Sequence, residues 1–270
     1  MRKRMKILVL TKQVPESQAT RMDEKTGTLI REAASSVINP LDLHALECAL
    51  TLKETMGEDV EVTCLSMGPA AATAVLRESL SMGADRGVLL SGREFAGSDT
   101  WCTGYALALA AKKIGPFDLI ICGERATDGE TGQTGPAMAT FLELPAVTFV
   151  SAVERCGGGW RVRRMLEDGY ETVEIDGSAL LCVLKEASVP RLPTLQGKRR
   201  ARGMEIETLT AEDVGASKED VGLNASPTRV VKIFRPIHIK DCEKLPAQDA
   251  EGAEKAVERV VELLKSKKII

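Results

Sequence analysis

The sequence predicts an α/β fold whose core is an open, mostly parallel five-stranded sheet of the nucleotide-binding type. Two observations support this prediction. Short apolar runs alternate with helix-length segments up to about residue 150, as expected for right-handed crossovers between parallel strands. One of these runs leads through a loop rich in Gly and Thr into a helix, which is how open α/β sheets build a phosphate site.

The elements of this sheet follow one another in a regular order. The apolar runs that we predict as strands are residues 6–11, 60–66, 87–90, 119–122 and 145–150. The first helix begins at Pro40 with Asn39 as its N-terminal cap and ends near residue 54. Further helices are expected over residues 70–82, 99–113 and from 135 onward. Ser98 or Asp99 is expected to cap the third helix.

The pattern changes after residue 150. Polar and apolar side chains alternate over residues 153–155, 160–166 and 170–175, and three glycines separate the first two segments. This pattern predicts antiparallel strands added to the edge of the sheet. The apolar run 180–184 is expected to belong to the same addition, which completes a nucleotide-binding domain over residues 1–185.

Residues 186–270 form the second predicted region, an extended arm with a C-terminal helix. The arm lacks a core-forming period, and its helix over residues 250–267 carries one apolar face made of Val257, Val260, Val261 and Leu264. A long arm that cannot bury itself usually lies on another subunit, and a mobile tail is the alternative. The net charge of −3 argues against nucleic acid, so we interpret one basic cluster as a solvated turn: Lys198, Arg199, Arg200 and Arg202.

The loop over residues 123–135 is the strongest candidate for a binding site. Its glycines allow backbone N–H groups to approach an anion, and neutral side chains add hydrogen-bond donors: Gly123, Gly129, Gly132, Gly135, Thr131, Gln133 and Thr134. It lacks the lysine of a P-loop, so it suits a phosphate-bearing ligand that is held rather than cleaved. Loops 12–15 and 67–69, with the helix start at Asn39, are expected beside it because parallel strands share one carboxyl edge.

Few reactive side chains accompany this site. Asp128 and Glu130 are candidates for a catalytic carboxylate pair, but we favour helix capping or ribose binding for them. His44 and His238 lie in no recognisable nucleophile or metal motif, so no catalytic residue and no metal ligand is predicted. A bound cofactor is therefore expected to carry the chemistry.

The cysteines and the apolar segments predict the cellular setting. The chain has 7 cysteines, scattered and without a Cys-x-x-Cys pair, which favours reduced thiols and a cytoplasmic location. The apolar run that follows the basic N-terminus, residues 7–10, is too short for a signal peptide. No run approaches the ~18 residues that a membrane span requires.

With these residues in view, the chain resembles the β subunit of electron transfer flavoprotein over nearly its whole length. The resemblance rests on KQVP at 12–15, Met22-Asp23 with TGT at 26–28, INP at 38–40, GPA at 68–70, MGADRG at 82–87 and DGETGQTGP at 128–136. Residues 162–182 follow the family signature, with Ser178 where that pattern usually has proline.

This resemblance implies a fold, partners and site residues. The fold is similar to that of adenine-nucleotide α-hydrolase relatives, with a C-terminal arm that wraps an α subunit holding the electron-carrying FAD. The implied nucleotide-binding residues are Leu10, Asn39, Pro40, Leu41, Asp42, Met67, Gly123, Arg125, Ala126, Thr127, Asp128, Gly129, Thr131, Gly132, Gln133 and Thr134. The implied loop that recognises a dehydrogenase contains Pro190, Leu192 and, as its anchor, Leu195.

The nucleotide in the β subunit divides the family. Ordinary members hold structural AMP, whereas bifurcating members hold a second FAD, accept hydride from NADH and send one electron to a low-potential carrier such as ferredoxin or flavodoxin. Gly129, Thr131 and Gly132 make the loop similar to the bifurcating form and leave room for a diphosphate, so we predict FAD with AMP as the alternative. A free-standing regulator of the universal-stress type is a third alternative, disfavoured by the arm and the Leu195 loop.

Overall fold

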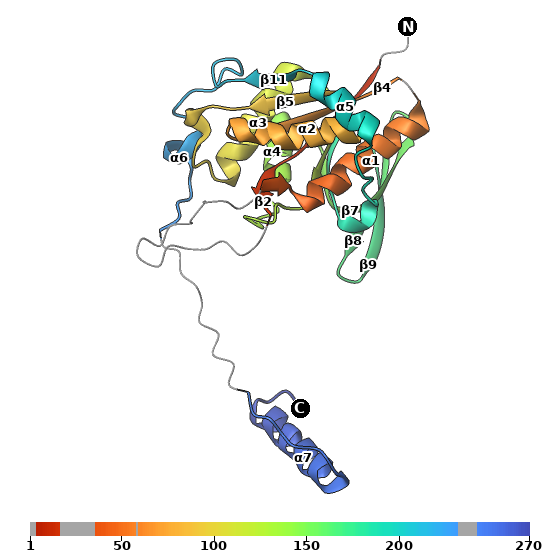
Figure 1. Cartoon of the computed structure of the whole chain (residues 1–270), viewed down its shortest axis with the longest axis vertical. Helices are drawn as coiled ribbons and strands as arrows, with labels where there is room; N and C mark the ends of the chain where they lie inside the picture. Colours follow the sequence, from red (N-terminus) through yellow and green to blue (C-terminus); the bar gives the residue numbers. More distant parts are fainter. Residues whose placement is uncertain (1–3, 17–35, 58, 232–241) are drawn as a thin grey trace. The chain divides into compact units, whose positions relative to one another are not determined.

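The computed structural model describes residues 4–16, 36–57, 59–231 and 242–270. The chain divides into two compact units, Met1–Val231 and Lys232–Ile270. The first unit contains a nine-stranded sheet and the ligand pocket, and the second contains one long helix (Figure 1).

The sheet of the first unit is parallel over most of its width. In spatial order its strands are β11 (Ile206–Leu209), β5 (Arg86–Leu90), β4 (Val60–Met67), β1 (Met5–Leu10), β6 (Leu119–Gly123), β10 (Ala179–Val183), β7 (Ala146–Cys156), β8 (Gly159–Leu166) and β9 (Gly169–Ile175). All neighbours from β11 to β7 pair in parallel, whereas β7–β8 and β8–β9 are antiparallel. A separate antiparallel pair joins β2 (Gln13–Pro15) to β3 (Ser36–Ile38).

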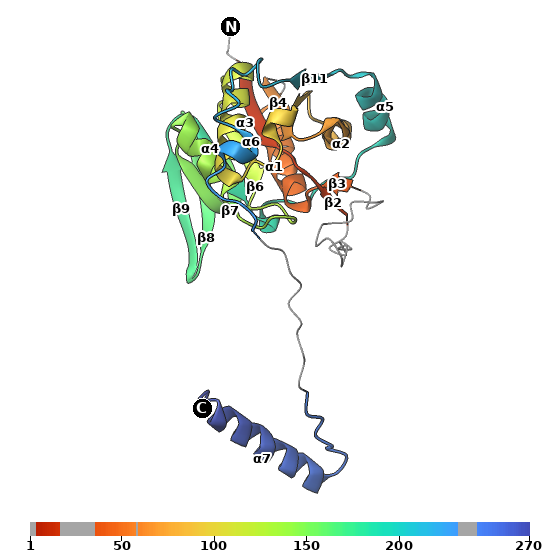
Figure 2. The same ribbon diagram turned by 90° about the vertical axis from the view of Figure 1, so that its left-hand side faces the viewer.

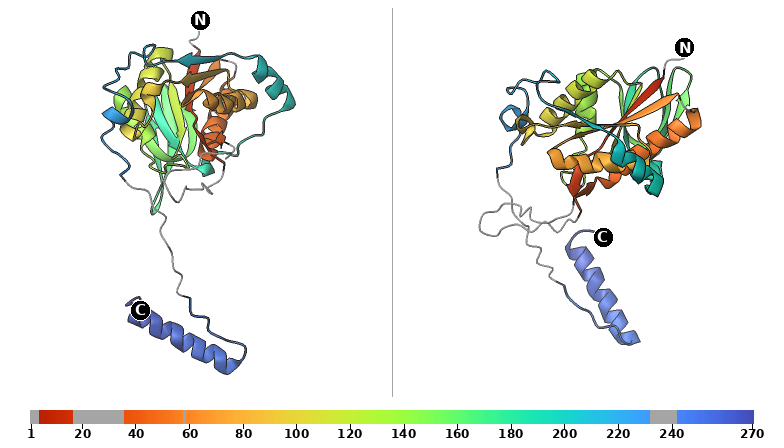
Figure 3. Two further views of the ribbon diagram at one scale, coloured as in Figure 1. Left: turned by 60° about the vertical axis from the view of Figure 1, so that its left-hand side comes forward. Right: turned by 45° about the horizontal axis from the view of Figure 1, so that its top comes forward.

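Helices cover both faces of this sheet (Figure 2, Figure 3). The helices are α1 (Pro40–Met56), α2 (Thr73–Met82), α3 (Thr100–Ile114), α4 (Thr134–Leu142), α5 (Leu195–Gly203) and α6 (Gly222–Ala225), with 3-10 turns η1 (Ala70–Ala72), η2 (Arg93–Phe95) and η3 (Lys185–Ala187). Alternate residues of the central strand β1 enter two separate cores: Ile7 and Val9 pack with α1 and α2, and Leu8 and Leu10 pack with α3 and α4.

The α/β class and the predicted parallel strands are confirmed, but the sheet is wider than predicted. The run at 180–184 does not form an antiparallel edge: β10 lies between β6 and β7 and is parallel to both. All five of its residues are buried, as expected for an interior strand covered on both faces. The predicted strand 145–150 and segment 153–155 form one long strand, β7, with a register shift between Val150 and Ala152.

The arm region also contains more structure than predicted. The first compact unit continues to Val231, past the boundary expected at residue 185, because β11 extends the sheet and α5 packs on α2. The basic cluster lies on α5 and is not a turn. Arg200 is fastened there through its Nη2, which donates to the carbonyl oxygens of Leu80 and Ala84 at 2.8 and 3.1 Å.

The second unit contains the predicted amphipathic helix. Helix α7 (Ala250–Ser266) starts at Asp249, whose side chain accepts a 2.7 Å hydrogen bond from the Gly252 N–H. Val257, Val260 and Leu263 are exposed on it. Within this unit the helix therefore presents apolar side chains that nothing in the described residues covers.

Candidate functional site

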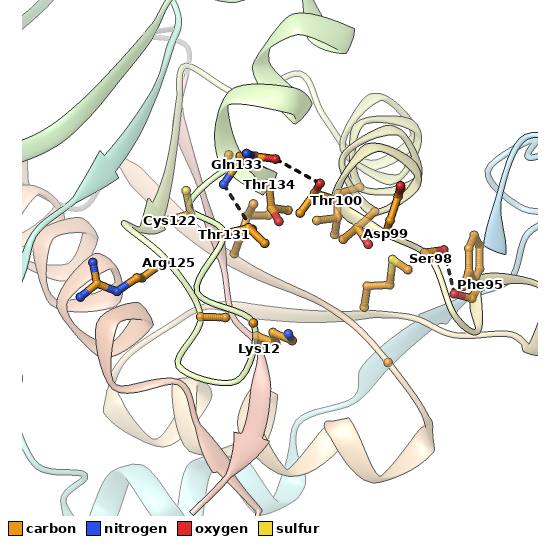
Figure 4. A pocket seen from close by; sticks show the side chains of 18 of the residues that line it. Lys12, Phe95, Ser98, Asp99, Thr100, Cys122, Arg125, Thr131, Gln133 and Thr134 are labelled. Carbon is orange, nitrogen blue, oxygen red and sulfur yellow. Dashed lines mark hydrogen bonds between the residues drawn. The ribbon is translucent and has the colours of Figure 1, made fainter. Parts of the chain in front are cut away.

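A large pocket lies where the parallel strands β1, β4, β5 and β6 end. Its volume is ≈ 1070 Å³, and its wall includes Leu10 at the end of β1, Met67 at the end of β4, Ser91 after β5 and Gly123 at the end of β6. Figure 4 shows polar side chains gathered around this pocket, with Thr131 and Gln133 on one side and Ser98 and Asp99 on another. The carboxyl edge of the sheet is therefore the candidate site, as the sequence predicts.

Asn39 shapes the β6–α4 loop and does not cap α1. Its side chain makes no capping hydrogen bond to α1. Its Nδ2 donates to the Arg125 carbonyl oxygen at 2.9 Å, and its Oδ1 accepts from the Thr127 N–H at 3.2 Å. The side chain thus pairs with one carbonyl group and one N–H group of the loop, and it holds the loop against the start of α1.

Asp42 joins two strand ends beneath the pocket. Its two carboxylate oxygens accept from the N–H groups of Lys12, at 2.8 Å, and Gly123, at 3.3 Å. Burial raises the pKa of Asp42 to about 7, against the opposing effect of these hydrogen bonds and of Asn39. The space around it is tight, since a Cβ on Gly123 would lie 2.6 Å from the Asp42 Oδ1. Asp42 therefore has a structural role at the site, since it links the chain after β1 to the end of β6.

Lys12 and Asp128 form an ion pair across the pocket rim. The Lys12 Nζ lies 2.7 Å from the Asp128 Oδ1, and both side chains are partly exposed. Asp128 is thus paired with a cation and not with Glu130, which adopts a positive φ of 53° at the end of the turn. This pairing gives no support to a catalytic carboxylate pair in the loop.

The N-terminus of α4 opens into the pocket. No side-chain cap is formed at Gln133, so the first N–H groups of α4, at Thr134 and Gly135, lack a capping acceptor within the described structure. Gly129 has open space where a Cβ would stand, and Gly132 adopts a φ of +63° with its nearest neighbour 3.6 Å away. Free amides, a helix dipole and room for a bulky anion therefore coincide here.

The opposite side of the pocket was not predicted from the sequence. It is formed by the β5–α3 loop, by the start of α3 and by a segment far along the chain, with lining residues Ser91, Gly92, Arg93, Phe95, Ala96, Gly97, Ser98, Asp99, Thr100, Thr103 and Thr228. A usable signal existed, because a loop that follows the parallel strand 87–90 opens at the same edge as the other loops. The sequence around Thr228 does not indicate a binding residue, because Thr228 is brought to the pocket only by the path of the arm.

Most of the predicted nucleotide-binding residues line this pocket. Those that do are Leu10, Asp42, Met67, Gly123, Arg125, Ala126, Gly129, Thr131, Gly132, Gln133 and Thr134. Pro40 and Leu41 begin α1 beneath the loop and, like Asn39, Thr127 and Asp128, are not in its wall. Pro190, Leu192 and Leu195 lie elsewhere, before and at the start of α5, where both leucines are exposed.

The described residues contain no group of three or more His, Cys, Asp or Glu side chains placed to hold a metal ion. No helix among them is long and apolar enough to cross a membrane.

Fold and pocket together define an α/β domain with a glycine-rich loop and a pocket at the carboxyl edge of a parallel sheet. The family model described as "Electron transfer flavoprotein domain" matches residues 26–214. An electron transfer flavoprotein subunit beta from Thermoanaerobacterium thermosaccharolyticum is 43% identical over 267 residues, which cover 98% of this chain and 100% of the relative. The chain belongs to the electron transfer flavoprotein family, among its β subunits, and the resemblance of its motifs is confirmed.

Two other relatives carry names that describe larger assemblies. The caffeyl-CoA reductase-Etf complex subunit CarD of Acetobacterium woodii is 44% identical over 232 residues, covering 86% of this chain and 88% of the relative. The acryloyl-CoA reductase electron transfer subunit gamma of Anaerotignum propionicum is 38% identical over 266 residues, covering 96% and 98%. Electron transfer is therefore the common role of the family members that this chain matches.

Proposed function

We propose that this chain pairs with an α subunit to form a heterodimeric electron transfer flavoprotein whose β-subunit pocket holds FAD. The heterodimer would pass electrons between NADH or acyl-CoA-type dehydrogenases and carrier proteins. The observation that carries the proposal is the pocket itself. Its volume of ≈ 1070 Å³ lies just above the roughly 300–1,000 Å³ typical of small-molecule sites, and polar residues line it on both the α4 side and the α3 side.

The fit to a dinucleotide rests on both sides of the pocket. On the α4 side, the free amides of Thr134 and Gly135 and the open space at Gly129 and Gly132 suit a diphosphate. On the α3 side, the pocket wall also includes Phe95 and Thr103, which lie outside the β6–α4 loop. A mononucleotide, which is smaller and has one phosphate, would leave part of this volume empty.

In this proposal the side chains of the site bind and orient the nucleotide, and the flavin carries the redox chemistry. When bound, a β-site flavin would supply hydride acceptance from NADH and one-electron transfer to ferredoxin or flavodoxin and to the α-subunit FAD. Asn39 and the Lys12–Asp128 pair would hold the loop over the phosphates, and the buried strand ends around Leu10 and Met67 would exclude water from one wall.

The alternative function is that of an ordinary β subunit in which AMP stabilises the fold. The α4 side alone meets the needs of a single phosphate, so this alternative uses the same residues. A regulator of the universal-stress type has no support, because the family match spans residues 26–214 and full-length relatives are electron transfer subunits.

The partners follow from the relatives and from the exposed segments. The names of the relatives include a caffeyl-CoA reductase complex and an acryloyl-CoA reductase. We assign the docking of such a dehydrogenase to Pro190, Leu192 and Leu195, and the contact with the α subunit to residues 186–270, including α7. All seven cysteines are free thiols, which supports a reducing cytoplasmic location.

The test is the nucleotide content of the heterodimer after co-expression with its α subunit and acid release. We expect two FAD and no AMP for the wild type, and loss of one FAD when Gly129→Asp and Gly132→Asn fill the open space. Gly158→Asp with Gly177→Asn is the matched control, because these glycines also have open surroundings and lie outside the pocket wall. One FAD with one AMP in the wild type would establish the ordinary alternative.

A further inference from the structure

Three large apolar side chains are almost fully exposed on the segment that runs from η3 to the first residue of α5. Val189, Leu192 and Leu195 are 89%, 86% and 88% exposed. A flexible segment of this kind would lose conformational freedom on binding, and that loss weakens docking unless the segment is already ordered. The contacts beneath the segment therefore decide how well it can dock.

The segment is fastened to α1 through Arg191. The Arg191 N–H donates to Glu47 Oε2 at 3.0 Å, its Nε donates to the same oxygen at 2.9 Å, and its Nη2 donates to Glu47 Oε1 at 2.8 Å. Glu54, two turns along the same helix, also pairs with the guanidinium, at 3.1 Å from Nη2. The Glu47 side chain is only 9% exposed, so this carboxylate depends on Arg191 for its charge partner.

Fixed points on both sides enclose the exposed residues. Ser188 is bonded to His44 of α1, with its Oγ donating to the His44 carbonyl oxygen at 3.0 Å and its own carbonyl oxygen 2.9 Å from His44 Nδ1. After the segment, Thr194 Oγ1 accepts from the Gly197 N–H at 2.9 Å and starts α5. Between these two contacts, Arg191 attaches the segment to α1, and it directly precedes Leu192 in the chain.

We propose that Arg191, held by Glu47 and Glu54, is a positioning residue that keeps the apolar segment over residues 189–195 in its docking conformation. The proposal rests on the assignment of Leu192 and Leu195 to dehydrogenase docking. The guanidinium is partly buried against α1, whereas the apolar side chains are exposed to solvent. Its role is to lower the ordering cost of docking, because the planar, bidentate pair fixes both a backbone N–H and a side chain.

The test compares the heterodimers of Arg191→Gln, Arg191→Lys and Leu195→Ala with the wild type. Two quantities are measured: hydrogen exchange of the amides in residues 188–197, and the KM and kcat for electron transfer with an acyl-CoA dehydrogenase from the same organism. Arg161→Gln is the matched control, since Arg161 on β8 also pairs with two glutamates, Glu154 on β7 and Glu174 on β9. Nucleotide content verifies that each variant retains the distant pocket.

Arg191→Gln should speed exchange in residues 188–197 by about tenfold or more and raise the KM several-fold with little change in kcat. Arg191→Lys should restore part of both, because lysine keeps the charge without the bidentate fork. Leu195→Ala should raise the KM without faster exchange. Faster exchange with an unchanged KM in Arg191→Gln, or unchanged exchange, would overturn the positioning role. If Leu195→Ala also left the KM unchanged, the docking assignment itself would fail.

Discussion

Helices α3 and α4 both begin at the pocket, but only α3 has a side-chain cap at its N-terminus. Asp99 caps α3 by accepting from the Cys102 N–H at 3.1 Å, and its other oxygen accepts from the N–H and Oγ1 of Thr228 at 3.0 and 2.8 Å. Helix α4 has no side-chain cap at Gln133. Helix α3 therefore presents a carboxylate to the pocket, whereas α4 presents N–H groups that no side chain caps.

The two N-termini would orient a phosphate-bearing ligand in the pocket. Burial raises the pKa of Asp99, but the hydrogen bonds from Cys102 and Thr228 outweigh it, and the pKa lies below its ordinary value. A negative charge at α3 repels phosphate, whereas the dipole and free N–H groups of α4 attract it. We infer that the phosphates face α4 and the nucleoside faces α3, and the variants below test this orientation.

The largest expected effect comes from Gly135→Ala at the start of α4. A Cβ at this position would lie 2.6 Å from the Cys182 Sγ and 2.8 Å from the Cys122 Sγ, both buried on neighbouring strands. The helix must move away from the sheet, which should cost about 3 kcal/mol of stability and withdraw its amides from the pocket. Thermal unfolding and nucleotide content of the heterodimer measure the two consequences.

Two companion variants make this prediction specific. Gly158→Ala adds the same methyl group where no atom lies within 4 Å and should leave both measurements unchanged. Cys182→Ala in the Gly135→Ala background removes the nearer sulfur and should recover part of the stability. A Gly135→Ala protein with wild-type nucleotide content would show that the position of α4 does not control binding.

A smaller, pH-dependent effect is expected from Asp42, which lies beneath the α4 side. The pKa of Asp42 is about 7 in the folded chain, against the ordinary value of 3.8 for the unfolded chain. At pH values between these two, the folded state binds the proton more tightly than the unfolded state does. Its contribution to stability is therefore full below about pH 4 and is lost as the pH rises through 7. Between these limits the wild type should lose about 2–4 kcal/mol relative to Asp42→Asn.

Denaturant unfolding of both heterodimers at a series of pH values gives this difference. Asp213→Asn provides a control of opposite sign, because hydrogen bonds from Thr210 lower the pKa of Asp213 and its contribution is lost as the pH falls. Parallel pH profiles of the wild type and Asp42→Asn would contradict a raised pKa for Asp42.

The same two sides of the pocket mark how far the sequence could predict this protein. The α4 side was predictable because glycines, threonines and a strand–loop–helix order occur together in one continuous segment. The α3 side was not predicted, since Asp99 and Thr228 lie far apart in the chain and meet only after the arm has folded back. The role of Asn39 was also misassigned, because a cap residue and a loop anchor look identical in sequence.

The limits of the fold prediction have a similar cause. The apolar run 180–184 fits any buried strand, and only pairing with β6 and β7 decides that it lies inside a parallel sheet. Strand β11 has four residues, too few for a clear period, and is defined by its register with β5. Long periodic helices such as α1 and α3 depend on local pattern and were predicted within a few residues.

The smallest effect is expected from giving α4 the carboxylate that α3 already has. Gln133→Asp should weaken nucleotide affinity by about tenfold, near 1.4 kcal/mol, because the new charge opposes the phosphate and competes for the same amides. Gln133→Asn is the decisive comparison: it removes the same glutamine and has the size of Asp but no charge. Titration of the nucleotide-free heterodimer with FAD and with AMP measures both variants. Equal affinities for the Asp and Asn variants would mean that no phosphate faces α4, and the inferred orientation would then have to be reversed.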